Sequence, residues 1–433
     1  MRIVFTDCNV IDVEEGCRVM PDCDIYVEDG KIAKICPHGM VPQGWKVEDM
    51  KGAYAAPGLV NMHVHLFGTG APSKILAGGK AQTAVLKFVH TPLGKAVLGL
   101  LVQSAAKNQL YSGVTTLRAV GDFCNSDIAL KRKTARGKDS ARGLKMLVSG
   151  PAITVTGGHG AGTFAVYADD PKELEKLVDV NVGAGADFIK ICVTGGVMDA
   201  KRRGEPGELK MSAEQVKAVC DRAHAHGKIV AAHVESRQGV EVAALNGVDT
   251  IEHGALMSGE AVAAMKARKG AFVTTYSPAL PYCKLSPEIT KLNEDSTYNS
   301  QIVLEGMRDS SRQAYAEGIA VGMGTDSSCP FCTQYDFWRE VVYFHKVGGF
   351  TPEQALSVAT IGNAKILGLG GVTGSLKEGK CADIVFTDRN PVEDLTALGE
   401  IRTVVASGRV IRNPKIKRNA MIKEELDQIM REL

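Results

Sequence analysis

The chain has 433 residues, of which 45% are hydrophobic and 23% are charged, with 51 basic against 49 acidic residues. This composition is typical of a globular protein with one large and one smaller domain, and the net charge of +2 gives no electrostatic footprint for nucleic acid. No run approaches the ~18 consecutive apolar residues of a membrane span, and the N-terminus has no signal-peptide core. We therefore expect a cytoplasmic protein that acts on a small molecule, with no nucleic-acid or membrane partner.

The eleven cysteines are an odd number and are scattered along the chain, so we do not expect a disulfide framework. One close pair, Cys329 and Cys332, has the spacing of a redox or metal pair. No second such pair completes a zinc knuckle, and we interpret these two residues as pocket-lining or free thiols.

Short β-strands are predicted near both ends of the chain. Glu28-Asp29-Gly30-Lys31 is a hairpin turn signal, and Ser407-Gly408-Arg409 is a second turn. We expect residues 1–56 and 365–412 to be two halves of one composite β-sandwich domain, with a helical tail at 413–433. The strand-like segments are 3–10, 24–27, 31–35, 382–386 and 401–406.

Between these halves, residues 57–364 alternate short apolar strands with amphipathic helices, such as 212–226 and 237–246. This pattern predicts βα units and a parallel sheet, and eight repeats favour an α/β fold with a closed (β/α)8 TIM barrel. An open doubly wound sheet is the alternative, but no early strand is followed by a Gly-rich phosphate loop. The predicted strands are 58–66, 113–119, 144–153, 187–194, 228–234, 249–252, 271–276 and 320–324.

Histidines recur at the ends of these strands, where barrel enzymes keep their active sites. His63 and His65 alternate along the first strand and so share one face, while His233 and His253 end the fifth and sixth strands. Histidines bonded to backbone within the core are the alternative. Because four of only ten histidines lie at strand ends, we favour a metal site built from neutral imidazoles.

Lys190 lies inside the predicted fourth barrel strand, where a charged amine is expensive unless it is paired. It could form an ion pair with a nearby carboxylate. We favour a second interpretation, in which the neutral amine adds carbon dioxide and becomes a carbamate, N6-carboxylysine, that bridges two metal ions.

Asp326 ends the eighth strand. A carboxylate there can bind a metal ion and accept a proton from an activated water molecule. It could instead cap a following helix, since Asp is a favoured capping residue, but its place among the strand-end ligands favours the metal role.

With these residues placed, the chain resembles the amidohydrolase superfamily over nearly its whole length. Within it, the chain is most similar to the imidazolonepropionase-like branch that includes metal-dependent dipeptidases and prolidases. The motifs that carry the resemblance are Ala-Pro-Gly-Leu-Val-Asn-Met-His-Val-His at 56–65, Ile-Glu-His-Gly at 251–254, Gly-Thr-Asp at 324–326, and the closing segment 374–385.

The resemblance implies two divalent metal ions, with zinc as the expected metal. His63 and His65 would hold the more buried ion, and His233 and His253 the more exposed one. Carboxylated Lys190 would bridge both ions. Asp326 would complete the first site and act as the general base.

The resemblance also implies that His159, in the loop Thr156-Gly157-Gly158-His159-Gly160, polarises the scissile carbonyl. Dipeptidase-like members usually carry a Tyr two residues after the fifth-strand His, but this chain has Glu235 there. This difference leaves a different amide or a cyclic amide open as the substrate, in place of a dipeptide. The expected substrate contacts are His159, Arg118, Arg202, Arg203, Glu235, Arg237 and Tyr276.

We therefore expect a hydrolase in which a metal-bridging hydroxide attacks an amide carbon, and the substrate is a dipeptide or an N-acyl amino acid. A cyclic-amide or carbamate hydrolase, or a deaminase, is the alternative on the same scaffold. A non-catalytic scaffold protein is a third reading. The apolar helix at 96–106 would suit a subunit interface, and we expect a homo-oligomer.

Overall fold

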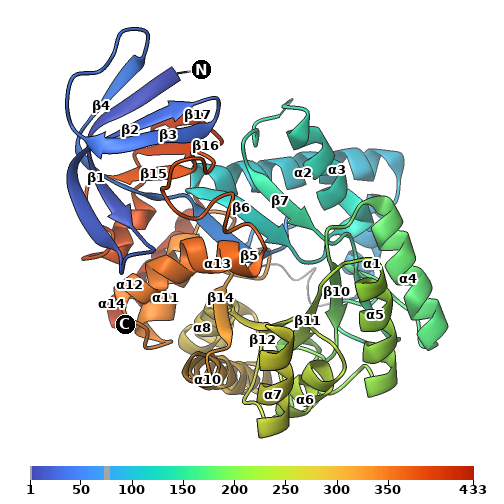
Figure 1. Cartoon of the computed structure of the whole chain (residues 1–433). Coiled ribbons are helices and arrows are strands. Elements are labelled where there is room, and N and C mark those ends of the chain that lie inside the picture. The colour runs from blue at the N-terminus through green and yellow to red at the C-terminus, as the bar shows by residue number, and fades with distance from the viewer. Residues whose placement is uncertain (1, 73–78, 138) are drawn as a thin grey trace.

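Strands from both ends of the chain form one mixed sheet in the computed structural model, which describes residues 2–72, 79–137 and 139–433 (Figure 1). N-terminal β4 pairs antiparallel with C-terminal β15, with Ala56 opposite Val385, so both chain ends contribute to one sheet, as predicted, while the sandwich and the bounds 1–56 and 365–412 stay predictions. Its seven strands belong to a single hydrogen-bonded sheet. In sheet order they are β17 (Arg409–Arg412), β16 (Thr403–Ala406), β15 (Ile384–Thr387), β4 (Lys46–Pro57), β1 (Arg2–Asp12), β2 (Arg18–Glu28) and β3 (Lys31–Pro37).

The hairpin between β2 and β3 turns at Asp29 and Gly30, as predicted. Their φ angles of 48° and 81° are both left-handed, which is what a two-residue type I′ turn requires. One face of the sheet buries an apolar cluster that includes Phe5, Ile25 and Phe386, and this cluster holds the two chain ends together.

Eight parallel strands form the barrel, confirming the predicted fold class. Two hydrogen-bonded ladders include β5-β6-β7 and β14-β13-β12-β11-β10, and a parallel bridge from Val64 to Ser327 joins the first strand to the segment after the last. The eight strands are β5 (Leu59–Val64), β6 (Val114–Ala119), β7 (Lys145–Val148), β10 (Ile189–Cys192), β11 (Val230–Val234), β12 (Thr250–His253), β13 (Ala271–Thr274) and β14 (Ala320–Met323).

The predicted third strand, 144–153, is in fact two strands. After β7 the chain turns and continues as β8 (Ala152–Thr154), which pairs with β10 and with β9 (Ala165–Tyr167). The break falls at Gly150, with φ of 67°, and at Pro151, which has no N–H to donate to a ladder.

Helices cover the outside of the barrel, and the tail helix α14 docks on α11 through an ion pair between Arg339 and Asp427 (Figure 1). In chain order the helices are α1 (Gly79–Val89), α2 (Pro92–Tyr111), α3 (Ser126–Ala135), α4 (Pro171–Ala184), α5 (Ala213–Ala225), α6 (Arg237–Leu245), α7 (Gly259–Arg268), α8 (Tyr276–Lys284), α9 (Pro287–Thr290), α10 (Glu294–Ala316), α11 (Phe337–Lys346), α12 (Pro352–Ser357), α13 (Asn363–Ile366) and α14 (Ala420–Glu432).

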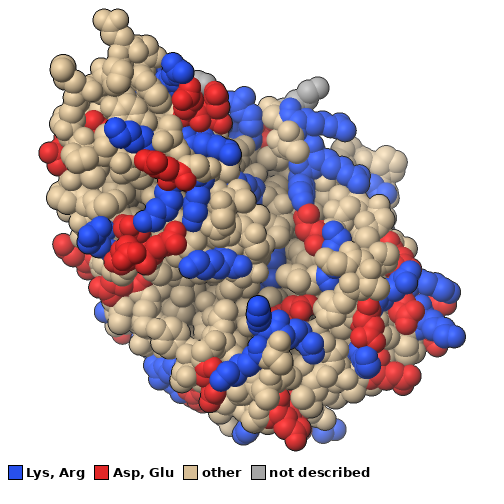
Figure 2. Space-filling model, in the orientation of Figure 1, with Lys and Arg blue, Asp and Glu red and all other residues tan. Residues whose placement is uncertain are grey.

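Helix α2 exposes several apolar side chains, including Leu93 and Leu100, which are 67% and 69% exposed. In the described part of the chain, no single helix is long and apolar enough to cross a membrane. The bent pair Gln82–Val89 and Pro92–Tyr111, at 96° to each other, meets that test only when taken together. The predicted subunit contact on this helix stays a prediction. Figure 2 shows basic and acidic side chains interspersed over the face seen in Figure 1.

The first and last barrel strands approach closely where the candidate ligands lie. The N–H groups of Thr325 and Asp326 both donate to the carbonyl of His63, at 3.1 and 2.8 Å. A Cβ atom on Gly324 would lie 2.4 Å from the backbone nitrogen of His63, closer than real Cβ contacts allow. Only glycine at this position lets Asp326 reach the histidines of β5.

We therefore predict that Gly324→Ala lowers the free energy of unfolding by about 1–3 kcal/mol, because the added methyl group must displace the backbone at His63. Urea denaturation would measure the change. Gly99→Ala is the control, since its Cβ would meet nothing within 4 Å, and it should stabilise helix α2 by up to about 1 kcal/mol. An unchanged Gly324→Ala midpoint would contradict the close approach.

Candidate metal centre

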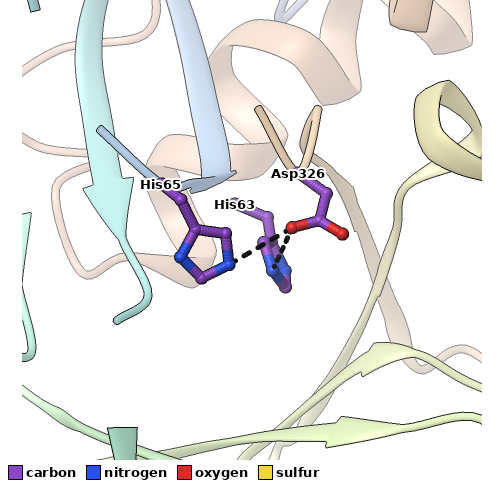
Figure 3. A group of neighbouring side chains, drawn as sticks. All are labelled: His63, His65 and Asp326. Atoms are coloured by element: carbon purple, nitrogen blue, oxygen red, sulfur yellow. Dashed lines mark ion pairs between the residues drawn. The ribbon is translucent and has the colours of Figure 1, made fainter. Parts of the chain in front are cut away.

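The first group of candidate ligands joins β5 to the segment after β14. His63 lies on β5 and His65 directly follows it, and their Nε2 atoms lie 3.4 and 3.2 Å from Oδ1 of Asp326 (Figure 3). A single carboxylate oxygen thus faces two imidazole nitrogens. This is a donor set that suits a divalent metal such as zinc.

Hydrogen bonds on the far side of each ring orient these two imidazoles. Nδ1 of His65 lies 2.6 Å from the carbonyl of Gly121, which can only accept, so Nδ1 carries the proton. Nδ1 of His63 lies 2.9 Å from Oε2 of Glu252. Both contacts leave the Nε2 lone pairs directed at the position beside Asp326, as carboxylate and carbonyl partners of metal-binding histidines do.

A second group consists of His233, Glu235 and His253, whose ligand atoms lie within 4.8 Å of one another. Nδ1 of His253 is 2.6 Å from Oγ1 of Thr275, which leaves Nε2 free. His233 is arranged the other way, because its Nε2 lies 3.2 Å from the carbonyl of Gly195. The nitrogen left for a ligand on His233 is therefore Nδ1.

The two groups adjoin through their rings. The centroids of His65 and His63 are 5.7 Å apart, those of His63 and His253 5.0 Å, and those of His253 and His233 4.6 Å. His159 stacks on His233 at 4.2 Å and an interplanar angle of 10°. The structure thus places all five predicted histidines in one continuous row at the barrel mouth.

The electrostatics favour neutral imidazoles and an ionised Asp326. Burial lowers the pKa of His65, and lowers the pKa values of His233 and His253 well below the usual value. Burial opposes ionisation of Asp326, but His63 and His65 outweigh it and hold the pKa of this carboxyl well below its ordinary range. These are the protonation states that metal binding requires.

Lys190 is 2% exposed and lies on β10, beside the strand that carries His233. Among the residues that the structure describes, none forms a hydrogen bond or an ion pair with its Nζ atom. Burial lowers the pKa of this amine. The alternative of an ion pair with a nearby carboxylate therefore finds no support, and the amine is buried without any polar partner of its own.

Arg118 lies beneath the histidines and is fully buried. Its Nη2 binds Oε1 of Glu252 at 2.6 Å, Nη1 donates to Thr250 at 3.0 Å, and Nε donates to the carbonyl of Met62 at 2.7 Å. Burial alone would raise the pKa of Glu252, but Arg118 and His63 hold it below its ordinary value. The expected substrate contact of Arg118 is wrong, because the side chain lies too deep and all its nitrogens are engaged.

The structure also does not support the expected substrate contact of Tyr276. It starts helix α8, is fully buried, and its hydroxyl lies 3.1 Å from Ser311 on α10, away from the histidines. Arg237 lies on the exposed first turn of α6. The exposed Arg202 and Arg203 pair with Glu205 and Asp295 at 3.6 and 3.8 Å.

Two further side chains border the row of histidines. Nδ1 of His159 forms a close ion pair with Asp199, in the short helix η3 (Val197–Asp199), which fixes the ring against His233. Sγ of Cys329 lies 3.6 Å from Oδ2 of Asp326, on the side away from the imidazoles. Cys329 thus borders the candidate site, in line with a pocket-lining thiol.

The backbone is strained at two candidate ligands. His253 and Asp326 have φ angles of 66° and 51°, in the left-handed region that non-glycine residues avoid. Such conformations cost about 1–3 kcal/mol each and persist where the surrounding structure enforces them, as at functional sites. Here they turn both side chains away from the strand direction and toward the other ligands.

Glu252, Asp199 and Thr275 support the ligands, but the sequence interpretation did not assign them roles. Glu252 alone had a usable signal, since it is a charged residue inside an apolar barrel strand, as Lys190 is. Asp199 and Thr275 come from a loop and a strand end whose partners only the folded barrel brings together.

Comparison with known proteins agrees with this geometry. Residues 54–411 match the Amidohydrolase family. The chain is similar in structure to a candidate prolidase from Bifidobacterium longum, with 33% identity, a TM-score of 0.85 and coverage of 99% of both chains. It is also similar to a Xaa-Pro dipeptidase with bound methionine in the active site, at 27% identity and a TM-score of 0.81 over 95% of this chain and 100% of the other.

A curated relative is ochratoxinase from Aspergillus niger, 28% identical over 265 residues, or 59% of this chain. The chain spans about half the length of that relative, 52%. The family match covers most of the chain and includes every candidate ligand described above. The protein is therefore a member of the amidohydrolase family.

Proposed function

We propose that the protein cleaves the amide bond of a dipeptide or an N-acyl amino acid at a binuclear metal centre bridged by carboxylated Lys190. The observation that carries this proposal is the buried Nζ atom of Lys190, which has no hydrogen-bond partner in the described part of the chain and lies beside two adjoining ligand groups. Addition of carbon dioxide to the neutral amine forms an N–C bond and releases one proton. The product is an anion with two oxygens, able to bind two cations at once.

Each group of the candidate site has its own role in the proposed reaction. Two divalent cations, for which zinc is the expected metal, would polarise the carbonyl and activate a water molecule when bound. Asp326 accepts the proton of that water and returns it to the leaving nitrogen. His159, oriented by Asp199, polarises the carbonyl oxygen of the substrate.

The proposed substrate class is based on proteins of similar structure. The candidate prolidase and the Xaa-Pro dipeptidase are similar over nearly the whole chain, which supports a dipeptide. The name ochratoxinase belongs to a more distant relative, and a different amide is compatible with the same chemistry.

We expect protein supplied with zinc and bicarbonate to hold about two metal ions per chain and Lys190→Ala to hold fewer than one, because the bridging ligand is lost. Elemental analysis of desalted protein measures this. Lys176→Ala, at an exposed lysine on α4, is the control and should keep the full content. Equal metal content in wild type and Lys190→Ala would refute the bridge.

Asp326→Asn should reduce kcat/KM about 10²–10⁴-fold, because an amide cannot accept the proton of the attacking water. Asn tolerates the left-handed backbone of this position, so the thermal midpoint should change little. Steady-state kinetics and thermal unfolding, measured on the same preparation, separate the two effects. Near-wild-type turnover would rule out Asp326 as the base.

Glu252→Leu should lower the free energy of unfolding by about 3–5 kcal/mol, because it leaves the Arg118 guanidinium buried and unpaired. The double variant Arg118→Met/Glu252→Leu should recover most of that loss, since no charge is then left unpaired. It should still bind zinc about 10–100-fold more weakly, because Nδ1 of His63 has lost its partner. Zinc titration and urea denaturation of both variants test this, and full zinc affinity in the double variant would argue against the positioning role.

A further inference from the structure

Glu235 is held at the edge of the histidine row by several contacts. It follows β11 two residues after His233, and Thr194 accepts a hydrogen bond from its backbone N–H at 3.0 Å. Oε2 of its carboxylate accepts the N–H of Val197 at 3.0 Å. The side chain is 9% exposed, and its Oε1 atom lies 4.0 Å from Nε2 of His233. The carboxylate is therefore rigidly placed beside the candidate active site.

This carboxylate has no lysine or arginine partner within the described residues. The neighbouring acids differ in this respect, because Asp199 pairs with His159, and Asp326 faces both His63 and His65. Burial first, and then the carboxylates of Asp326 and Asp199, raise the pKa of Glu235 well above its usual value. A buried carboxylate without a cation is costly, so Glu235 is placed to receive a positive charge from outside the protein chain.

The basic residues of the adjacent loop do not supply that charge. Lys210 lies 2.6 Å from Glu208, Arg202 pairs with Glu205, and Arg203 pairs with Asp295 and covers the ring of Tyr298. Each of these three cations is paired with an acid, and the fourth basic residue of the loop, Lys201, is exposed. Among the described residues, no basic side chain of this loop therefore pairs with Glu235.

A metal ion is one external cation that Glu235 could receive, because it belongs to the group formed with His233 and His253. However, its closest approach to His233 is to Nε2, the nitrogen engaged by the carbonyl of Gly195, and not to Nδ1. Glu235 therefore lies on the side of the imidazole away from the free nitrogen. This geometry favours a substrate cation over a metal.

We propose that Glu235 binds a cationic group of the substrate, the free α-ammonium of a dipeptide, and so selects dipeptides over N-acyl amino acids. This inference rests on the proposed amide hydrolysis at the same centre and narrows its substrate class. The rings of Phe164 and Phe67 lie 5.1 and 5.4 Å from that of His65 and give the row of histidines an apolar border.

The test compares leucyl-proline with 4-methylpentanoyl-proline, which has the same skeleton without the amine. In wild-type enzyme loaded with zinc and bicarbonate, kcat/KM should favour leucyl-proline. In Glu235→Gln, the ratio of the two kcat/KM values should fall about 10–100-fold, the factor expected for losing one buried charged hydrogen bond. Glu208→Gln, an exposed acid of the same loop, is the control and should keep the wild-type ratio.

Metal content measured on the same preparations separates the two possible roles. Unchanged metal content with a lowered ratio supports recognition of the ammonium group. Loss of metal from Glu235→Gln, together with an equal fall on both substrates, would show that Glu235 is a metal ligand and overturn the inference.

If neither compound is cleaved, the result contradicts the proposed dipeptide hydrolysis but not the recognition of a cation by Glu235. Binding of two small probes then tests that recognition. Calorimetry of the zinc-loaded protein with leucinol and with 4-methylpentan-1-ol compares a cationic probe with its neutral counterpart. Wild type should prefer leucinol, and Glu235→Gln should lose that preference. Equal binding of both probes by wild type would contradict recognition of a cation by Glu235.

Discussion

The candidate site depends on the closure of a parallel barrel between its first and last strands. Parallel strands place all their carboxyl ends at one edge, and closure brings the ends of β5 and β14 together. The close approach at Gly324 lets the N–H groups of Thr325 and Asp326, just after the last strand, donate to the carbonyl of His63. Residues 63 and 326, far apart in the sequence, therefore belong to one donor set.

Beneath that donor set, the structure buries charge that the fold alone does not need. Arg118 and Glu252 form an ion pair with no solvent exposure, and replacing such pairs with apolar residues is often neutral or stabilising. Here Glu252 of this pair fixes one nitrogen of His63. Positioning of His63 therefore explains the buried ion pair better than a contribution to the stability of the fold does. The left-handed backbone at His253 and Asp326 likewise lowers the stability of the fold, and it occurs where side chains must converge on one site.

Much of the architecture could be predicted from periodicity, because barrel strands are short apolar runs and their polar ends mark the active edge. The same rule identified His63, His65, His233, His253 and Asp326, and the structure does bring them together. Lys190 was identifiable because a lysine inside an apolar strand breaks the pattern, and its amine has no hydrogen-bond partner among the residues that the structure describes.

The rule failed where depth or direction mattered. Arg118 lies only one residue before the end of β6, yet this is enough to place it beneath the histidines. Tyr276 follows β13, but its ring turns outward to pack against α10. The prediction of a single strand at 144–153 did not take account of Gly150-Pro151, which divides this segment into β7 and β8. Sequence periodicity gives the face of a residue, whereas its height in the barrel depends on register and strand tilt.

The central claim, a binuclear centre bridged by Lys190, is tested most directly by anomalous diffraction from crystals grown with zinc and bicarbonate. The account predicts two zinc peaks ~3.5–4 Å apart, the spacing of two-metal sites. One should lie beside His63, His65 and Asp326 and the other beside His233 and His253, with carboxylate density on Nζ of Lys190 between them. A single zinc peak with an unmodified Lys190 side chain would contradict it.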